Sequence, residues 1–261
     1  MIDLRRSFLI SKKDIQEIYR RKYIIISVFV LPVAFSIIFP ILLILLVNSN
    51  SINESQVIRL REIFPELVYA EPKKIFLSYI LESLTTIFII LPAILPSILA
   101  SYSFVGEKTN KSFEPLLSTP IKELELLLGK YLACFIPVII PIYLSFILYS
   151  HLLNGFIGFN PLLNLKWILA LLTVAPLYSI LSIGFNVLIS SKVSDIRSAQ
   201  QLGGLIVLPS LLIFFSSLFG LTKLDISKIL ILDLGLALAA LLLFYISSKV
   251  FSREEILVRW R

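Results

Sequence analysis

The sequence has little of the chemistry on which enzymes and metal proteins depend. Among 261 residues there is one histidine, His151, and one cysteine, Cys134. A single cysteine excludes a disulfide within the chain. No HExxH or GxSxG pattern supports a hydrolytic centre, and no Walker-type GxxxxGK[ST] loop is present to cradle ATP phosphates. We therefore predict a non-catalytic chain with no cofactor or metal of its own.

Charged residues are also scarce, at 16% against 57% hydrophobic residues. Soluble domains carry roughly a quarter charged residues, so a water-soluble globule is not expected. The apolar residues fall in runs of about 20 or more, the length a helix needs to cross a bilayer. Six spans are predicted, at Tyr23–Val47, Phe76–Phe104, Leu126–Tyr149, Trp167–Ile189, Leu202–Leu221 and Ile229–Val250. The expected fold is an all-α, polytopic membrane protein.

The positions of Lys and Arg predict the orientation, because basic loops stay on the cytoplasmic side. With the N-terminus inside, the inner segments hold 17 of the 24 basic residues. Both termini are therefore expected in the cytoplasm. Topology and contact with membrane lipid account for the net charge of +7, so nucleic acid is not an expected partner.

The segment before the first span, residues 1–22, has apolar residues at helical spacing with cations between them. The apolar positions and Ser11 fall on one stripe, which comprises Leu4, Phe8, Ser11, Ile15, Ile18 and Tyr19. This pattern is typical of an amphipathic helix lying at the headgroup level. A generic basic flank preceding a span is the alternative, and periodicity alone does not separate the two.

The segment from Gly106 to Lys130, between the second and third spans, is predicted to be a polar loop containing a short helix. Glu114 and Pro115 fit a first turn after Ser112, and the two leucines that follow offer an apolar face. An exposed apolar face on the cytoplasmic side favours a docked partner. A capped connector that merely joins two spans is the alternative.

This segment resembles the signature of the ABC type-2 transporter permeases, which has an acidic-basic start, a Glu-x-Leu-Leu core, a Thr-Pro step and a closing Gly-Lys. The matching positions are Glu107, Lys108, Glu114, Leu116, Leu117, Thr119, Pro120, Gly129 and Lys130. The stretches Ala199–Pro209 and Phe251–Leu257 are also similar to family patterns, so the resemblance covers most of the chain.

The resemblance implies one transmembrane domain over residues 1–261. Its parts would be an N-terminal elbow helix (1–22), a six-span bundle (23–250), a cytoplasmic coupling loop (106–125) and a cytoplasmic tail (251–261). It also implies a plasma-membrane exporter of two permeases, either two copies or a pair of paralogues, with separate ATPase subunits that bind ATP and Mg. The expected docking residues are Glu107, Lys108, Ser112, Phe113, Glu114, Leu116, Leu117, Thr119 and Pro120. The alternative function is a six-span channel or scaffold that ATP does not drive. An intramembrane enzyme is disfavoured because catalytic clusters are absent.

Two carboxylates lie within predicted spans, Glu82 and Asp233. An ionisable residue at that position is a functional hypothesis by default, and Glu82 is the candidate for the substrate pathway. The alternative for each is a solvated carboxylate near the outer end of its span. Prolines occur in every predicted span except the sixth, and bends around a pathway or simple packing both explain them. The transported substrate is not encoded in any of these patterns.

Overall fold

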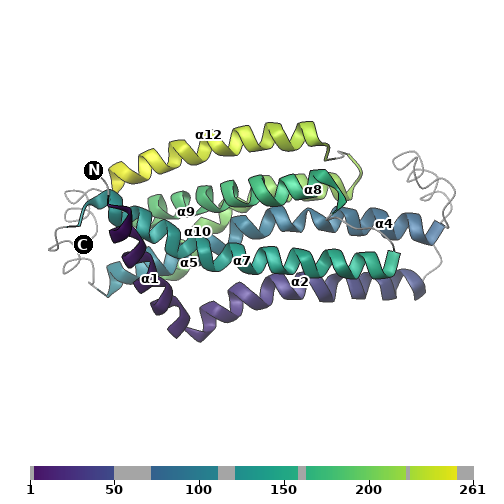
Figure 1. The fold of residues 1–261 in the computed structure, drawn as a ribbon, viewed down its shortest axis with the longest axis horizontal. Helices are drawn as coiled ribbons and strands as arrows, with labels where there is room; N and C mark the ends of the chain where they lie inside the picture. Colours follow the sequence, from purple (N-terminus) through teal and green to yellow (C-terminus); the bar gives the residue numbers. More distant parts are fainter. Residues whose placement is uncertain (1–2, 50–71, 111–120, 158–162, 222–223, 252–261) are drawn as a thin grey trace.

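The computed structural model describes residues 3–49, 72–110, 121–157, 163–221 and 224–251, and every regular element in these ranges is helical. Six helical stretches are long and apolar enough to cross a membrane: Lys22–Leu45, Phe76–Thr109, Glu123–Phe156, Leu165–Lys192, Ile196–Leu218 and Ile226–Val250. They run side by side along the long axis of the molecule (Figure 1). The predicted all-α, six-span fold is confirmed.

The elements, in chain order, are α1 (Leu4–Arg20), α2 (Lys22–Ser49), α4 (Pro72–Thr85), α5 (Ile87–Thr109), α7 (Glu123–Ile157), α8 (Leu165–Leu169), the π-helical turn η3 (Ala170–Val174), α9 (Ala175–Lys192), α10 (Ile196–Gly203), the 3₁₀ turn η4 (Gly204–Val207), α11 (Leu208–Leu218) and α12 (Ile226–Val250). Helix α1 lies obliquely across one end of the bundle, which we call the α1 end (Figure 1). The opposite end, where α4, α8 and α12 begin, is called the far end.

Helix α5 occupies the centre of the bundle. Its sequence is apolar around most of its circumference, as expected of a helix surrounded by others, and Leu91, Leu95 and Leu99 are at most 1% exposed. Its most extensive neighbour is α9. Small polar side chains join the two helices: Ser101 Oγ donates to Asn186 Oδ1 at 2.8 Å, and Asn186 Nδ2 donates to Ser97 Oγ. Such bonds between spans satisfy polar groups that lipid would leave unpaired.

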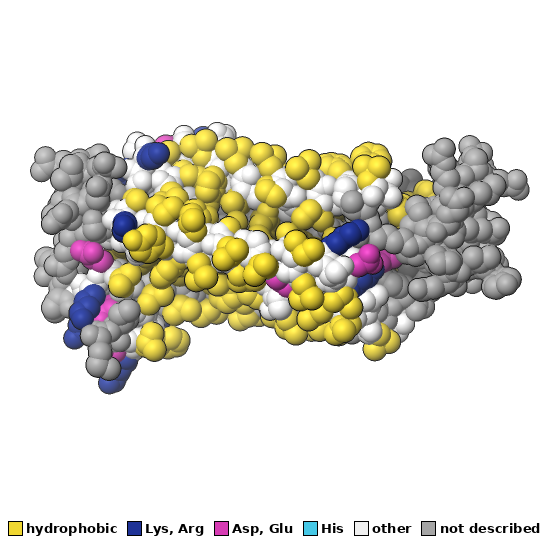
Figure 2. Space-filling model, turned by 90° about the horizontal axis from the view of Figure 1, so that it is seen from above, with side chains coloured by type: hydrophobic (Ala, Val, Ile, Leu, Met, Phe, Trp, Pro, Cys, Tyr) yellow, Lys and Arg dark blue, Asp and Glu magenta, His cyan; other side chains and the backbone are white. Residues whose placement is uncertain are grey.

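The peripheral helices present apolar side chains outward. Ile26 on α2, Leu212 on α11 and Ile231 on α12 are 57%, 72% and 71% exposed. Figure 2 shows one face that is hydrophobic along most of its length, with most of the visible charged side chains near its two ends. This distribution matches a bilayer core bounded by two polar headgroup layers.

Three of the spans are interrupted, two of them next to prolines. In the fourth span η3 ends two residues before Pro176, and in the fifth η4 ends two residues before Pro209. Proline has no backbone N–H to donate, which favours a different hydrogen-bond spacing in the turn before it, although the prolines inside α2, α5 and α7 leave those helices α-helical. The second span breaks between α4 and α5 at Thr86, where the Leu81 carbonyl accepts hydrogen bonds from the buried Tyr149 hydroxyl and from Thr85 Oγ1.

Candidate coupling site at the α1 end

The structure shortens the loop predicted between residues 106 and 125. Helix α5 continues to Thr109 and α7 begins at Glu123, so the segment is helical at both ends. The polar residues at the end of α5 and the start of α7 stay helical because their charged side chains have partners. A search for apolar runs alone does not detect such extensions of a span. Residues 111–120 lie outside the described residues. The calls for Ser112, Phe113, Glu114, Leu116, Leu117, Thr119 and Pro120 therefore remain predictions.

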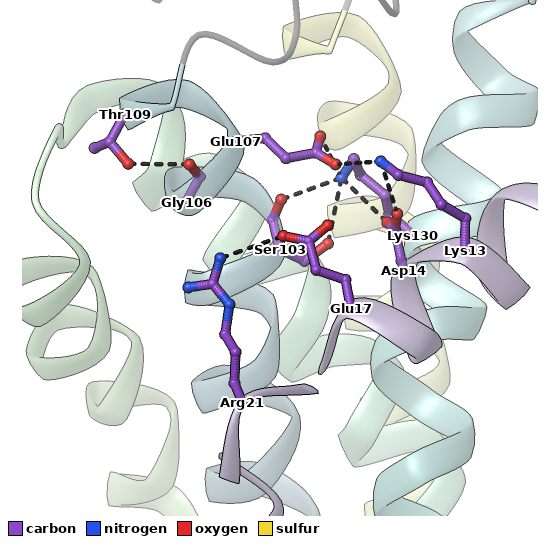
Figure 3. Close-up of polar contacts among 9 residues, drawn as sticks. All are labelled: Lys13, Asp14, Glu17, Arg21, Ser103, Gly106, Glu107, Thr109 and Lys130. Atoms are coloured by element: carbon purple, nitrogen blue, oxygen red, sulfur yellow. Dashed lines mark hydrogen bonds and ion pairs between the residues drawn. The ribbon is translucent and has the colours of Figure 1, made fainter. Parts of the chain in front are cut away.

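The two ends of the predicted signature meet in a buried ion cluster (Figure 3). Lys130 on α7 is fully buried, and its Nζ lies 2.7 Å from Glu107 Oε2 on α5 and 3.3 Å from Asp14 Oδ2 on α1. The same Nζ lies 3.1 Å from the Ser103 carbonyl oxygen. Lys13 on α1 reaches both carboxylates, at 3.4 Å from Glu107 and 3.6 Å from Asp14. Three helices that are distant in sequence are joined at one point.

The four charges of this cluster balance, with two lysines against two carboxylates. Burying an isolated charge is costly, and a buried pair repays that cost only when its geometry is good. Removal of one partner from a buried pair typically costs about 3–5 kcal/mol, because the other charge is left uncompensated. The cluster therefore penalises any movement of α5, α7 or α1 away from the other two.

A third carboxylate, Glu125, connects the starts of α1 and α7. Its side chain is 1% exposed and accepts hydrogen bonds from the backbone N–H groups of Asp3, at 2.8 Å, and Lys122, at 3.2 Å. The contact with Lys122 is the reach-back bond of a capping box, three residues into a helix. The Asp3 side chain in turn accepts from the Arg5 N–H and caps α1. One buried carboxylate thus holds both helix starts together.

Helix α1 crosses α7 at Gly129. A Cβ placed on this glycine would lie 2.8 Å from the Ser7 carbonyl oxygen and 2.8 Å from Ile10 Cβ. No side chain fits that space unless α1 shifts. The glycine of the Gly-Lys step therefore allows the close approach that brings Lys130 to Asp14.

Residues 4–20 form the amphipathic helix α1, but the predicted stripe is wrong for two of its members, because Ser11 and Ile18 lie on the inward face and not beside Leu4 and Phe8. Ser7, Ser11 and Asp14 are buried against the bundle. Leu4 and Phe8 are 73% and 60% exposed. An apolar face that turns away from the bundle suits lipid contact, and the position of α1 at the headgroup level remains a prediction.

Lys108 connects α5 to the turn between α9 and α10. Its Nζ lies 3.3 Å from the Val193 carbonyl oxygen and 3.5 Å from that of Ser190, at the C-terminal end of α9, where a cation complements the helix dipole. Two residues further on, Asp195 caps α10 by accepting from the Ser198 N–H at 2.9 Å. This backbone hydrogen bond holds the pKa of Asp195 below its ordinary value. The end of α5 therefore contacts α9 as well as α1 and α7.

The sequence analysis did not identify Lys13, Asp14, Ser103 or Glu125 as members of this site. A signal was present for Asp14, because Ser7, Ser11 and Asp14 recur every three to four residues on one face of α1. Such a small polar stripe predicts contact with protein, whereas the larger apolar side chains of the same helix predict contact with lipid.

Glu82, the pathway candidate, lies at the far end and is paired. Its carboxylate forms an ion pair with Lys166 on α8, and both side chains are less than one fifth exposed. The Lys166 ammonium also lies 5.4 Å from the ring centre of the buried Trp167. A direct bond between α4 and α8 is therefore the role that the geometry assigns to Glu82.

Six apolar helices, a central buried span and charges gathered at both ends define a multi-pass membrane protein. Residues 62–246 match the family of ABC-2 family transporter proteins. This match covers more than half of the chain, so the chain belongs to the ABC-2 transporter family. No curated protein matches the chain at a significant level.

Proposed function

We propose that this chain is the permease subunit of an ATP-driven exporter, and that the connector between α5 and α7 docks on a separate ATPase subunit that binds ATP and Mg. The observation that carries the proposal is the bond between Lys130 and Glu107. It joins the two helices that flank the connector, about half a turn before the end of α5 and about two turns after the start of α7.

The mechanism follows from this connection. A force applied to residues 111–120 reaches α5 and α7 together, because separating them would expose or unpair buried charge. Asp14 adds α1 to the same unit, and Lys108 passes the displacement of α5 to the C-terminal end of α9. Since α5 is the central span, its movement is felt by most of the bundle. Rigid-body movement of packed helices in response to a partner is a common switching device.

A pull-down from native membranes tests the docking step. We expect an ABC ATPase to be retained by the tagged chain, and Leu117→Asp in the connector to abolish that retention. The control is Leu163→Asp at the far end, where the leucine is 83% exposed and is not expected to meet the ATPase. Absence of an ATPase with the unaltered chain would overturn the proposal and favour a channel or scaffold that ATP does not drive.

Transmission is tested separately with Glu107→Gln. If the ion cluster transmits the movement of the connector to the spans, this variant still binds the ATPase. Transport falls, and the permease no longer changes the rate of ATP hydrolysis. Equal loss of docking and transport would instead make Glu107 part of the docking surface.

The orientation can be tested with one introduced cysteine. Cys134 is fully buried and does not compete for a membrane-impermeant maleimide. With Glu114→Cys we expect no labelling in intact cells and labelling in inverted vesicles, because the connector is proposed to face the cytoplasm. The reverse pattern would place the connector outside and contradict the proposal.

A further inference from the structure

Helix α2 carries an apolar groove on its outward face. The helix lies at the edge of the bundle (Figure 1), and its inward face, which includes Ile24, Val28 and Ser36, is buried. On the outward face, a groove of about 360 Å³ is lined by six residues of this one helix: Phe29, Val30, Val33, Ala34, Ile37 and Ile38. Ala34 has the smallest side chain of the six, with larger ones on both sides of it along the helix. The acyl chain of a lipid or another helix could cover an apolar surface of this kind.

A cation lies at the start of the same face. Lys22 is the first residue of α2 and is exposed, and its ammonium has no ion pair or hydrogen bond within the part of the chain that the structure describes. Lys22, Ile26 and Val30 are four residues apart, so they follow one another along one side of the helix. Ile26 and Val30 are 57% and 56% exposed, and Val30 belongs to the groove. The stripe that begins at the ammonium therefore leads into the groove.

The start of α2 favours an anion for a second reason. The first N–H groups of a helix and the helix dipole attract negative charge. The first turn of α2 contains no acidic residue, and the rest of the helix has none either. Arg20, two residues before Lys22, is exposed and adds a second cation at the end of α1. The negative charge that would complement this point has to come from outside the helix.

The distance from Lys22 to the groove matches the dimensions of one lipid leaflet. At 1.5 Å per residue, the groove extends from about 10 Å to about 24 Å beyond Lys22 along the helix axis. Half of a hydrocarbon core is about 15 Å thick, and the headgroup layer adds about 5–8 Å. With the ammonium in the headgroup layer, the groove lies alongside the acyl chains of the same leaflet.

We propose that this surface, formed by Lys22 and the six groove residues, binds one anionic phospholipid. The phosphate group pairs with the Lys22 ammonium, and an acyl chain occupies the groove between Phe29 and Ile38. A molecule with a negative headgroup and an apolar tail complements both parts of the surface at once.

A second copy of the chain is less complementary to this surface. In a two-fold symmetric dimer that pairs α2 with α2, the same patch of both copies meets itself. The two Lys22 side chains would then approach each other, and α2 has no carboxylate to compensate the like charges. A lipid phosphate meets the ammonium without this repulsion.

Native mass spectrometry of the full chain in detergent tests the proposal. The probe is an equimolar mixture of phosphatidylglycerol and phosphatidylcholine with identical acyl chains, of which only the first has a net negative charge. We expect one molecule of phosphatidylglycerol to be retained in preference to phosphatidylcholine. In Lys22→Gln this preference should fall about fivefold, which corresponds to roughly 1 kcal/mol for one basic residue near an anionic surface. Lys192→Gln, on an exposed lysine at the end of α9, is the matched control and should leave the preference unchanged.

The groove is tested separately with Ala34→Phe, whose ring would take the space of the acyl chain. We expect this variant to lose the bound phosphatidylglycerol, whereas Ile231→Phe, on the outward face of α12, retains it. The midpoint of thermal unfolding without added lipid shows whether both variants are folded. The unaltered chain and Lys22→Gln, which changes an exposed side chain, give their result even if Ala34→Phe does not fold.

Two outcomes of the headgroup test would overturn the proposal: equal retention of the two lipids by the unaltered chain, or equal losses in Lys22→Gln and Lys192→Gln. A folded Ala34→Phe that retains phosphatidylglycerol would overturn it as well, and loss of a dimer in that variant would identify the groove as a contact between copies. No ATPase takes part in these measurements, so their failure leaves the proposed function standing, and failure of ATPase retention leaves the lipid site standing.

Discussion

Lys130 on α7 and Glu107 on α5 are in contact, with 2.7 Å between Nζ and Oε2, although 22 residues separate them in the chain. Their contact closes the base of the connector formed by residues 111–120. Because Lys130 is fully buried and Glu107 nearly so, the pair behaves as one structural unit that a displacement of the connector moves as a whole.

Loss of the ammonium at this point is expected to destabilise the bundle strongly. Lys130→Met keeps the length of the side chain but leaves Asp14 and Glu107 buried with one fewer cation. We expect a loss of about 3–5 kcal/mol in the free energy of unfolding, seen as a lower midpoint of thermal unfolding in detergent. Lys12→Met removes a charge from an exposed position of α1 and is expected to have no effect. Equal midpoints for both variants would show that the buried pair contributes nothing.

The close approach of α1 and α7 gives a prediction with a control inside the same site. Gly129→Ala places a methyl group against the backbone of α1 and is expected to cost about 1–3 kcal/mol through overpacking. Gly106→Ala, on the other side of the cluster, meets nothing within 4 Å and gains helix propensity, so it is expected to be neutral or stabilising. Thermal unfolding of both variants checks this. The test is which variant loses more stability. If Gly106→Ala lowered the unfolding midpoint more than Gly129→Ala, the packing described at Gly129 would be contradicted.

The ion pair at the far end separates a structural role of Glu82 from a role in substrate binding. Glu82→Lys and Lys166→Glu each place like charges together, whereas the double variant restores an opposite-charge pair. For residues in contact we expect a coupling free energy of roughly 0.5–3 kcal/mol in a double-mutant cycle of unfolding. Transport should recover in the double variant if the pair only joins α4 to α8. A double variant that folds normally but does not transport would instead support a role of Glu82 in the substrate pathway.

The sequence predicted the six spans because each is a long apolar run, and a run of that length has few other structures open to it. It also singled out Glu107, Lys108, Gly129 and Lys130 as positions of a family signature, and the docking role predicted for Glu107 and Lys108 stays a prediction. It did not predict that Glu107 and Lys130 are in contact. The register between two helices depends on how their side chains pack, and a hydropathy pattern does not contain this information.

The polar face of α1 was missed for a related reason. The apolar residues Leu4 and Phe8 dominate the periodicity of residues 1–22. The prediction therefore rested on these residues, whose face of the helix was expected to contact lipid. The inward stripe consists of Ser7, Ser11 and Asp14, residues that are ordinary at any solvated surface. The structure shows that this stripe is an interface, because Asp14 lies across from the buried Lys130 and the Ser7 backbone lies against Gly129.

Two adjacent glycines test the polar seam at the centre of the bundle. A Cβ on Gly203 would lie 2.5 Å from Ser97 Oγ and even closer to the amide nitrogen of Asn186, whereas a Cβ on Gly204 meets nothing within 4 Å. These atoms can retreat only by breaking the hydrogen bonds that join Ser97, Asn186 and Ser101 across α5 and α9. We expect Gly203→Ala to cost about 1–3 kcal/mol and Gly204→Ala to cost less than a third of that. Amide hydrogen exchange of α10 and thermal unfolding measure both effects, and similar values for the two variants would mean that α10 does not pack against this seam.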